Sequence, residues 1–315
     1  MNRRWVCNDV WMDIFLHLDH AQLGLKMALL SPRFNALVDK HFDGKSELPL
    51  LRQIRIAKKG TKLSVATKSN PLPIKIRFIN LRIEYIGHSV IEFLRSNRQI
   101  FEKGTHMDLY LDLDNLHYDN KGIVQPIWNF FAGEIWPIFV PNIRHLIGHH
   151  LGDLRCHISP TIFTDCNQLN SIVSDNLLPA AIADDGPNAT ARQALTKWLN
   201  TPTKNGQPKQ LICCGSASET NECVVNFKKE FLRANSSASY IIQFKTYTSI
   251  AQFELVNGRT KEKLTLKAED DDDHVYTHIN CVLERCQIGR TIQWEDKKTD
   301  KLNNVIISLY GNCIG

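Results

Sequence analysis

The sequence lacks any apolar run that approaches the roughly 20 residues a helix needs to cross a bilayer. It also lacks a phosphate-cradling Gly-rich loop with a following Lys, a Gly-x-Ser-x-Gly elbow and a His-Glu-x-x-His pair. The first absence argues against a membrane-spanning chain, and the others remove the sequence signatures of several common enzyme mechanisms. We therefore expect a protein that is not an enzyme, with no catalytic residues, no cofactor, no metal and no membrane partner.

A strong excess of charge of one sign is missing as well. The 38 Lys and Arg residues against 33 Asp and Glu residues leave a net charge of +5, well short of the dense basic loading typical of nucleic-acid-binding proteins. The nine cysteines are odd in number and scattered along 315 residues, which favours free thiols in a reducing compartment over a disulfide framework. Since Asp9 and Asp13 interrupt the first apolar stretch, a secretory signal is not expected. These features predict a cytoplasmic or nuclear protein.

The first 40 residues are dense in large apolar side chains at helical spacing. Steps of one, three and four residues indicate an amphipathic first helix, with Asp9, Asp13 and His17 on its other side. Pro32 interrupts the pattern before a third short helix. The apolar positions of the three expected helices are Val10, Ile14, Phe15, Leu18, Leu23, Met27, Leu30 and Phe34.

This helical unit is too small to enclose all of its own apolar surface. Its helical stretch of about 35 residues is shorter than the roughly 40 residues below which a domain usually needs disulfides, a metal or a partner to stay folded. It carries no metal-ligand pattern of its own. Its remaining apolar side chains must therefore pack either on the rest of the chain or on a second protein.

The order of these residues resembles the F-box motif. The resemblance runs through Asp9-Val10-Trp11, Ile14-Phe15, Leu18, Leu23, Leu30-Ser31, Phe34 and Leu37. The chain departs from the motif at Val6-Cys7, where the family prefers Leu-Pro, and at Gln22 and Pro32. Farther along, Ser89 to Leu94 together with Trp128 and Trp136 are similar to a large group of F-box proteins expanded in roundworms.

The resemblance implies a function and a partner. F-box proteins dock on an adaptor subunit that joins them to a cullin-based ubiquitin ligase, and the rest of the chain recruits a protein target. The eight apolar positions named above are then the expected adaptor-binding residues. The chain would act as a substrate adaptor in protein ubiquitination, for a target that the sequence does not identify.

Beyond residue 45 the pattern changes to helices and strands in rough alternation. Alternating apolar positions predict two early strands at Leu51–Ala57 and Lys75–Ile86. Helix-then-strand pairs follow at Val90–Phe101 and Met107–Leu113, Ile127–Phe139 and Ile143–Ile147, Ala191–Leu199 and Gln210–Cys214, and Val224–Leu232 and Tyr240–Phe244, with a further strand at Leu169–Val173. This order predicts a mixed α/β fold, either an open sheet or an irregular stack similar to leucine-rich repeats.

The last quarter of the chain has a different pattern. Four segments alternate in the manner of antiparallel strands: Gln252–Val256, Lys263–Lys267, His278–Glu284 and Asn304–Tyr310. We therefore expect two domains, an F-box-like helical unit over residues 1–45 and an α/β substrate-recognition domain over residues 46–315 that ends in antiparallel strands.

A basic region follows the helical unit. Its bases include Arg52, Arg55, Lys58, Lys59 and Lys62, and it extends to Arg82 in a stretch nearly free of acids. Such a region could follow phosphates or bind an acidic protein, independently of a ubiquitin ligase. Few aromatic residues interleave with these bases, so we favour a simpler role, in which lysines discourage strands from pairing edge to edge.

Two groups of cysteine and histidine residues have side chains of the kind that bind metal ions. The group His145, His149, His150, Cys156 and His157 has zinc-ligand chemistry but no known zinc-site spacing. Cys213 and Cys214 are adjacent on an expected strand, where their side chains point to opposite faces and hardly chelate one ion together. We interpret the histidines as surface or core residues and the two cysteines as small apolar core residues.

Overall fold

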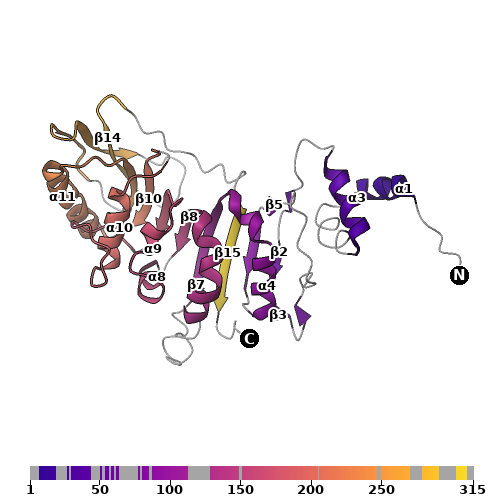
Figure 1. Cartoon of the computed structure of the whole chain (residues 1–315). Helices are drawn as coiled ribbons and strands as arrows, with labels where there is room; N and C mark the ends of the chain where they lie inside the picture. The colour runs from indigo at the N-terminus through magenta and orange to yellow at the C-terminus, as the bar shows by residue number, and fades with distance from the viewer. Residues whose placement is uncertain are drawn as a thin grey trace, which may run out of the picture. The chain divides into compact units, whose positions relative to one another are not determined.

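The structure is a computed structural model of the chain. It describes residues 7–18, 27, 30–43, 50–51, 54–56, 58–59, 62–63, 77–78, 80–84, 87–112, 128–148, 151–204, 206–246, 250–269, 279–290 and 303–310. The chain divides into two compact units. The first comprises residues 1–106, 112–121 and 299–315, and the second comprises residues 107–111 and 122–298. Figure 1 shows the elements of both units along the chain.

The amino-terminal part of the first unit contains two described helices, α1 (Asn8–Leu16) and α3 (Pro32–Asp43). They agree with the first and third helices expected from the sequence. Most of the expected middle helix, including Leu23, lies outside the described residues. The three-helix form of this unit therefore stays a prediction, and so does a domain boundary near residue 45.

The rest of the first unit is built from short strands and helical segments. Its described elements are β1 (Leu50–Leu51), β2 (Ile54–Ile56), β3 (Lys58–Lys59), β4 (Lys62–Leu63), β5 (Arg77–Phe78), β6 (Asn80–Ile83), α4 (His88–Ser96), η2 (Arg98–Lys103) and β15 (Asn303–Tyr310). Strand β6 lies between β2 and β15 and runs parallel to both. The expectation that the last strand is antiparallel is therefore wrong for β15. An alternating pattern identifies a strand but does not determine its partner or its direction.

The second unit contains the longer elements. Five residues of β7 (Thr105–Asp112) belong to it. Its other described elements are η3 (Phe131–Ile135), α7 (Trp136–Phe139), η4 (Val140–Asn142), β8 (Ile143–Gly148), α8 (Leu151–His157), α9 (Ile162–Asp165), β9 (Ser171–Ser174), α10 (Ala191–Asn200), β10 (Lys209–Cys214), α11 (Ala217–Arg233), β11 (Tyr240–Thr246), β12 (Phe253–Asn257), β13 (Glu262–Glu269) and β14 (Ile279–Gln287). The strand order is β12-β13-β14-β11-β10-β9-β8-β7.

Strands β8 to β11 are parallel and lie side by side in chain order. Strands β14, β13 and β12 extend the sheet in antiparallel fashion. The register aligns one buried apolar side chain from each central strand into a row across the sheet: Leu146, Ile172, Leu211, Ile242 and Leu283. This row is the core of the second unit, because each member contacts the next strand on the same face.

Helices α10 and α11 cover the face that carries this row. Each begins with a capping box, Thr190 with Gln193 and Ser216 with Glu219, which satisfies the free N–H groups of the first turn. Trp198 of α10 lies against Lys209, and Phe227 of α11 lies 5.9 Å from Tyr240 between ring centroids. Since Lys209 and Tyr240 are paired in register, both helices lie on one face.

The mixed α/β class predicted from the sequence is confirmed. Antiparallel pairing is confirmed for β12, β13 and β14. Cys213 is buried and its neighbour Cys214 is half-buried, as expected for consecutive residues on a strand. Within the described part of the chain, no helix is long and apolar enough to span a bilayer.

Candidate functional site

Helices α1 and α3 pack on each other through a small apolar core. Phe15, Leu37 and Val38 are buried at its centre. The ring of Trp11 meets that of Phe34 edge to face, with 4.8 Å between their centroids. Within the described residues, every apolar member of this core falls between Trp11 and Val38. The core therefore joins side chains of α1 and α3 with Leu18 and Met27 from the segment between the two helices.

A polar contact also joins the two helices. The guanidinium of Arg33, in the first turn of α3, donates from Nη2 to Asn8 Oδ1 over 2.7 Å. Asn8 is the first residue of α1, so the contact ties the beginnings of the two helices together. Because both side chains lie near solvent, the core rather than this contact carries most of the packing energy.

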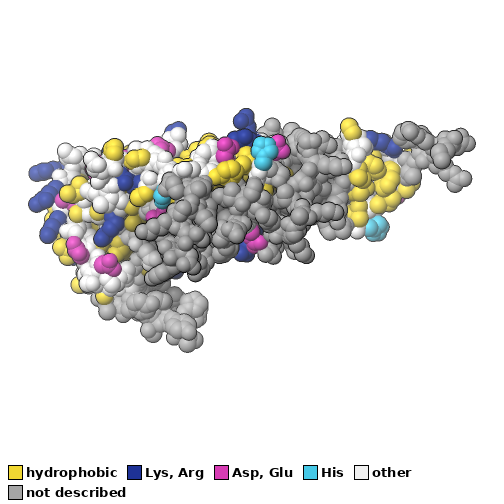
Figure 2. Space-filling model, turned by 90° about the horizontal axis from the view of Figure 1, so that it is seen from below, with side chains coloured by type: hydrophobic (Ala, Val, Ile, Leu, Met, Phe, Trp, Pro, Cys, Tyr) yellow, Lys and Arg dark blue, Asp and Glu magenta, His cyan; other side chains and the backbone are white. Residues whose placement is uncertain are grey.

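Three of the predicted adaptor-binding side chains remain exposed. Val10 is 47% exposed, Ile14 is 37% exposed and Leu30 is 65% exposed. Figure 2 shows hydrophobic side chains gathered over this end of the chain, where α1 and α3 lie. Exposed aliphatic side chains grouped in this way mark a surface that can bind another protein.

The other predicted adaptor-binding residues are buried, half-buried or outside the described part of the chain. Phe15 is buried in the core of the helical unit, where it holds α1 on α3. Leu18, Met27 and Phe34 are half-buried against that core. Leu23 lies outside the described residues. Burial thus separates core residues from exposed ones, which helical spacing alone does not do.

The basic region is described mainly through its backbone. Strands β3 and β4 pair in antiparallel fashion and bring Lys59 opposite Lys62. Arg55 lies on β2, and Arg52 lies outside the described residues. Arg82 Nε pairs with Glu84 Oε1 over 2.9 Å, which offsets one positive charge at the end of the region.

The histidine and cysteine group does not form a metal centre among the residues the structure describes. His157 stacks on Trp128, with ring centroids 4.9 Å apart, and Cys156 is exposed on α8. Residues 149 and 150 lie outside the described part of the chain. The stacking gives His157 a packing role.

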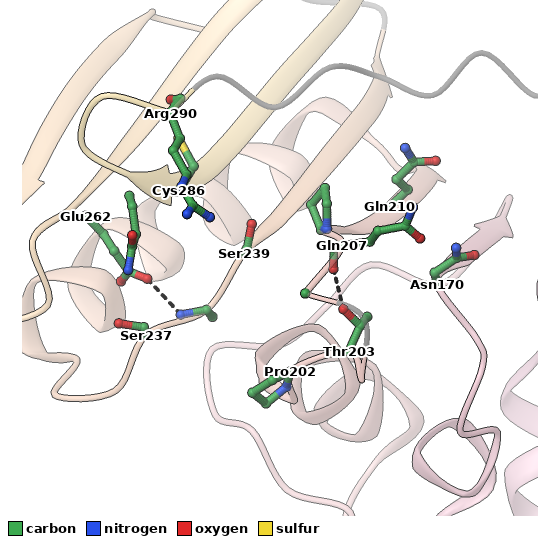
Figure 3. A pocket seen from close by; sticks show the side chains of 14 residues that line it. Asn170, Pro202, Thr203, Gln207, Gln210, Ser237, Ser239, Glu262, Cys286 and Arg290 are labelled. Carbon is green, nitrogen blue, oxygen red and sulfur yellow. Dashed lines mark hydrogen bonds between the residues drawn. The ribbon is translucent and has the colours of Figure 1, made fainter.

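A pocket of about 420 Å³ opens in the second unit. It lies where the parallel strands begin, because Asn170 precedes β9, Pro208 precedes β10 and Ser239 precedes β11. Its described lining residues are Asn170, Pro202, Thr203, Gly206, Gln207, Pro208, Gln210, Ser237, Ala238, Ser239, Glu262, Cys286, Gln287 and Arg290. Figure 3 shows Glu262 and Arg290 on one side of the pocket and Asn170 and Gln210 on the other.

The wall formed by β13 and β14 is held by buried charges. Arg285 donates from Nε and Nη2 to Glu262 Oε2, over 3.1 Å and 2.7 Å. The backbone N–H of Ala238 donates to Glu262 Oε1 over 2.8 Å, and Arg285 Nη2 also donates to Ser236 O. These bonds anchor the loop before β11 to the sheet. The carboxylate of Glu262 is therefore already paired.

A thiol in the same pocket is chemically inert at neutral pH. Cys286 is buried, and burial raises the pKa of its thiol to about 12. The single S–H of Cys286 has two acceptors within reach, Glu284 Oε1 at 3.2 Å and Arg290 O at 3.3 Å. Because the thiolate is the reactive form of cysteine, this pocket offers no nucleophile there.

A second pocket, of about 490 Å³, lies at the opposite ends of the same strands. Asp175, Cys214 and Lys245 line it, each at the end of a parallel strand, together with the start of α11. Ligands of open α/β sheets usually bind at such carboxyl ends. Here the carboxylate of Glu219 already accepts hydrogen bonds from the N–H and Oγ of Ser216 at the helix start. A phosphate would have to compete with that carboxylate.

The first pocket has no motif in the sequence that predicts it. Its residues come from separate segments, and none of them belongs to a recognisable motif. One signal was present, because Asn170 and Gln210 stand at the beginnings of two predicted strands. If those strands are parallel and adjacent, the two amides meet at one edge of the sheet.

Comparison with known proteins does not assign the chain to a family. No protein-family model, no curated protein and no solved structure matches it.

Proposed function

We propose that this protein is a non-enzymatic substrate adaptor of a cullin-based ubiquitin ligase. In this proposal the amino-terminal helices dock on the adaptor subunit of the ligase, and the α/β part of the chain recruits a protein target. Ubiquitin transfer itself belongs to other subunits of the ligase.

One observation supports the proposal: aliphatic side chains on and next to α1 and α3 are exposed, although the two helices share a core of buried apolar residues. Val10 and Ile14 are four residues apart on α1, so they lie on one face of that helix. Leu30, just before α3, is the most exposed of the three. A partner with an apolar groove would remove these side chains from water, which is the main favourable contribution to such an interface.

The burial pattern also indicates which residues would contact the adaptor. Val10, Ile14 and Leu30 are the expected contacts, with Leu18, Met27 and Phe34 beside them. Phe15 supports the surface from beneath, because its ring is enclosed between the two helices. Truncation of Phe15 would therefore weaken docking indirectly, by unfolding the unit.

A binding assay with the purified adaptor subunit tests the proposal. We expect the wild-type chain to bind and Ile14→Glu to lower the affinity at least about tenfold, because a charge replaces an apolar contact. Val225→Glu is the matched control, since it adds the same charge at an exposed aliphatic residue of α11 in the second unit. The wild type failing to bind, in conditions where a known F-box protein does, would refute the proposal.

A second candidate function rests on the paired lysines of the basic region. The backbone register of β3 and β4 sets position 59 opposite position 62, so the strands bring together two stretches of a region rich in bases and nearly free of acids. Nucleic acid or an acidic protein would offer the negative charge that such a region binds. Retention of the chain on immobilised polynucleotide, measured from low to high salt, tests this function. Binding that is absent even at low salt would exclude nucleic acid.

A further inference from the structure

The pocket at the beginnings of β9, β10 and β11 contains polar groups that the fold leaves without partners. Gln210 is 6% exposed and lines the pocket, and its side-chain amide bonds to no residue that the structure describes. Asn170 Oδ1 is also buried and has no partner among the described residues. The two residues are neighbours, because the backbone N–H of Gln210 donates to Asn170 O over 2.8 Å. A buried polar atom without a hydrogen bond, as Asn170 Oδ1 is, is uncommon in folded proteins and calls for an explanation.

Arg290 supplies the one unpaired charge among the described lining residues. Its backbone N–H donates to Gln287 O over 3.0 Å, and its carbonyl accepts from Cys286 Sγ. Its guanidinium has no partner among the residues that are described. Glu262 does not neutralise it, because both carboxylate oxygens of Glu262 are taken by Arg285 and Ala238. Figure 3 shows Arg290 and the two amides on opposite sides of the pocket.

We propose that this pocket binds a short segment of polypeptide that carries one carboxylate. The planar guanidinium of Arg290 matches a carboxylate, which it can bind through two parallel hydrogen bonds. Side-chain amides both donate and accept, so Asn170 and Gln210 match the C=O and N–H groups of a peptide bond. A volume of about 420 Å³ lies within the usual range for small-ligand pockets and accommodates a few residues.

The composition of the pocket favours a peptide over a nucleotide. None of its described lining residues is aromatic, so it offers no ring on which a base could stack. Among the lining residues that the structure describes, Arg290 alone is a free cation, whereas nucleotide phosphates carry more than one negative charge. Two prolines and several small residues, including Ala238 and Gly206, leave room for side chains of varied shape.

A segment of a protein is the kind of partner that the proposed recruiting function requires. Peptide binding by this pocket can be tested without that function, and only the biological role of the binding rests on it. The carboxylate has two possible sources in a protein, the end of the chain or an Asp or Glu side chain. Both present the same group to Arg290. The experiment separates them, and it needs no ligase component.

The test measures retention of the full-length protein on three immobilised hexapeptide libraries whose randomised positions exclude Asp and Glu. The first library has free carboxyl ends, the second is amidated, and the third is amidated with one Glu at a central position. We expect retention on the first or the third library and not on the second. The library that retains the protein identifies the source of the carboxylate.

Variants then locate the binding in the pocket. Arg290→Gln should weaken binding to the retaining library by about tenfold to a hundredfold, because a hydrogen bond between charged groups is lost. Arg290 is exposed, so the change leaves the core intact. Gln210→Leu, of similar volume, should weaken binding several-fold. Arg98→Gln, at an exposed arginine of the first unit, removes the same charge and should have no effect.

Equal retention on the neutral library, or unchanged binding by Arg290→Gln, would overturn the inference. So would the absence of peptide binding, alone or with retention on polynucleotide. Adaptor binding measured in parallel distinguishes the two proposals, because Arg290→Gln leaves the amino-terminal helices unchanged. If the chain binds the adaptor but no peptide, the proposed function stands and the proposal of a peptide-binding pocket is refuted.

Discussion

Glu262 and Arg285 form a buried ion pair across the neighbouring strands β13 and β14, with 2.7 Å between Glu262 Oε2 and Arg285 Nη2. The side chain of Glu262 is 1% exposed and that of Arg285 is 6% exposed. The guanidinium also lies over the rings of Phe231 and Tyr240. The pair therefore joins the sheet, helix α11 and the wall of the peptide pocket.

Replacing only one residue of this ion pair should strongly destabilise the fold. Arg285→Met leaves the Glu262 carboxylate buried and unpaired, so we expect a loss of about 3–5 kcal/mol in the free energy of unfolding. Adding Glu262→Gln removes that charge and keeps an acceptor for the N–H of Ala238, so the double variant should regain part of the loss. Urea unfolding measures all three proteins. Equal stability of the single and double variants would contradict the role given to the charge.

Lys209 should make stability depend on pH. Its side chain is buried, with Nζ donating to Trp198 O, and burial lowers its pKa to about 7 from 10.5. Between these values the unfolded chain holds a proton that the folded chain has released. The free energy of unfolding should therefore rise with pH above about 7, by at most about 1.4 kcal/mol per pH unit. Below pH 7 both states are protonated and this contribution is flat.

The measurement compares the wild type with Lys209→Met by urea unfolding at pH 7.0, 7.75 and 8.5. The difference in unfolding free energy between the two proteins should change in favour of the wild type as the pH rises. Tyr240, paired with Lys209 in register, does not titrate in this window, because burial raises its pKa to about 12. If the difference in unfolding free energy stays constant across the three pH values, Lys209 does not cause the pH dependence of stability.

The free cysteines should differ sharply in how fast iodoacetamide alkylates them. Cys7 and Cys156 are exposed, whereas Cys166, Cys213 and Cys223 are buried and burial raises their pKa. Iodoacetamide attacks the thiolate, so a short pulse on the native protein should label the two exposed cysteines and spare the three buried ones. Peptide mass spectrometry reads the labelling, and the urea-unfolded chain is the positive control. Labelling of Cys213 in the native protein as fast as Cys156 would be inconsistent with the fold.

Gly215 should tolerate no side chain. It lies between β10 and α11, and a Cβ atom there would come within 2.4 Å of Leu178 Cδ1. Gly215→Ala should therefore lower the free energy of unfolding by about 1–3 kcal/mol, as overpacking of a core does. Gly133→Ala is the matched control, because its Cβ would meet nothing within 4 Å. Thermal unfolding compares the two, and equal melting temperatures would refute the steric explanation.

Several elements could be predicted closely because their signal is local. The range Ala191–Leu199 matches α10, Gln210–Cys214 matches β10, and Tyr240–Phe244 lies within β11. Helical and alternating patterns are properties of a few consecutive residues, so the sequence carries them without any tertiary information.

Other features depended on contacts between distant segments. The alternation of Asn304–Tyr310 identified β15 but could not reveal its parallel pairing with β6, because the partner lies more than 200 positions earlier in the chain. Likewise, the helical spacing of α1 places Ile14 and Phe15 among the same apolar residues. Only packing against α3 leaves one exposed and encloses the other.

The sequence by itself determined the α/β class, the positions of its longer helices and strands such as α10, β10 and β11, and the spacing of the apolar side chains in the amino-terminal helices α1 and α3. The tertiary structure decided which of those side chains remain exposed and assembled the pocket of Asn170, Gln210 and Arg290. The reason is physical: periodicity follows from backbone geometry within one element, whereas burial and pockets follow from which elements become neighbours, and strand pairing sets that over long separations in sequence.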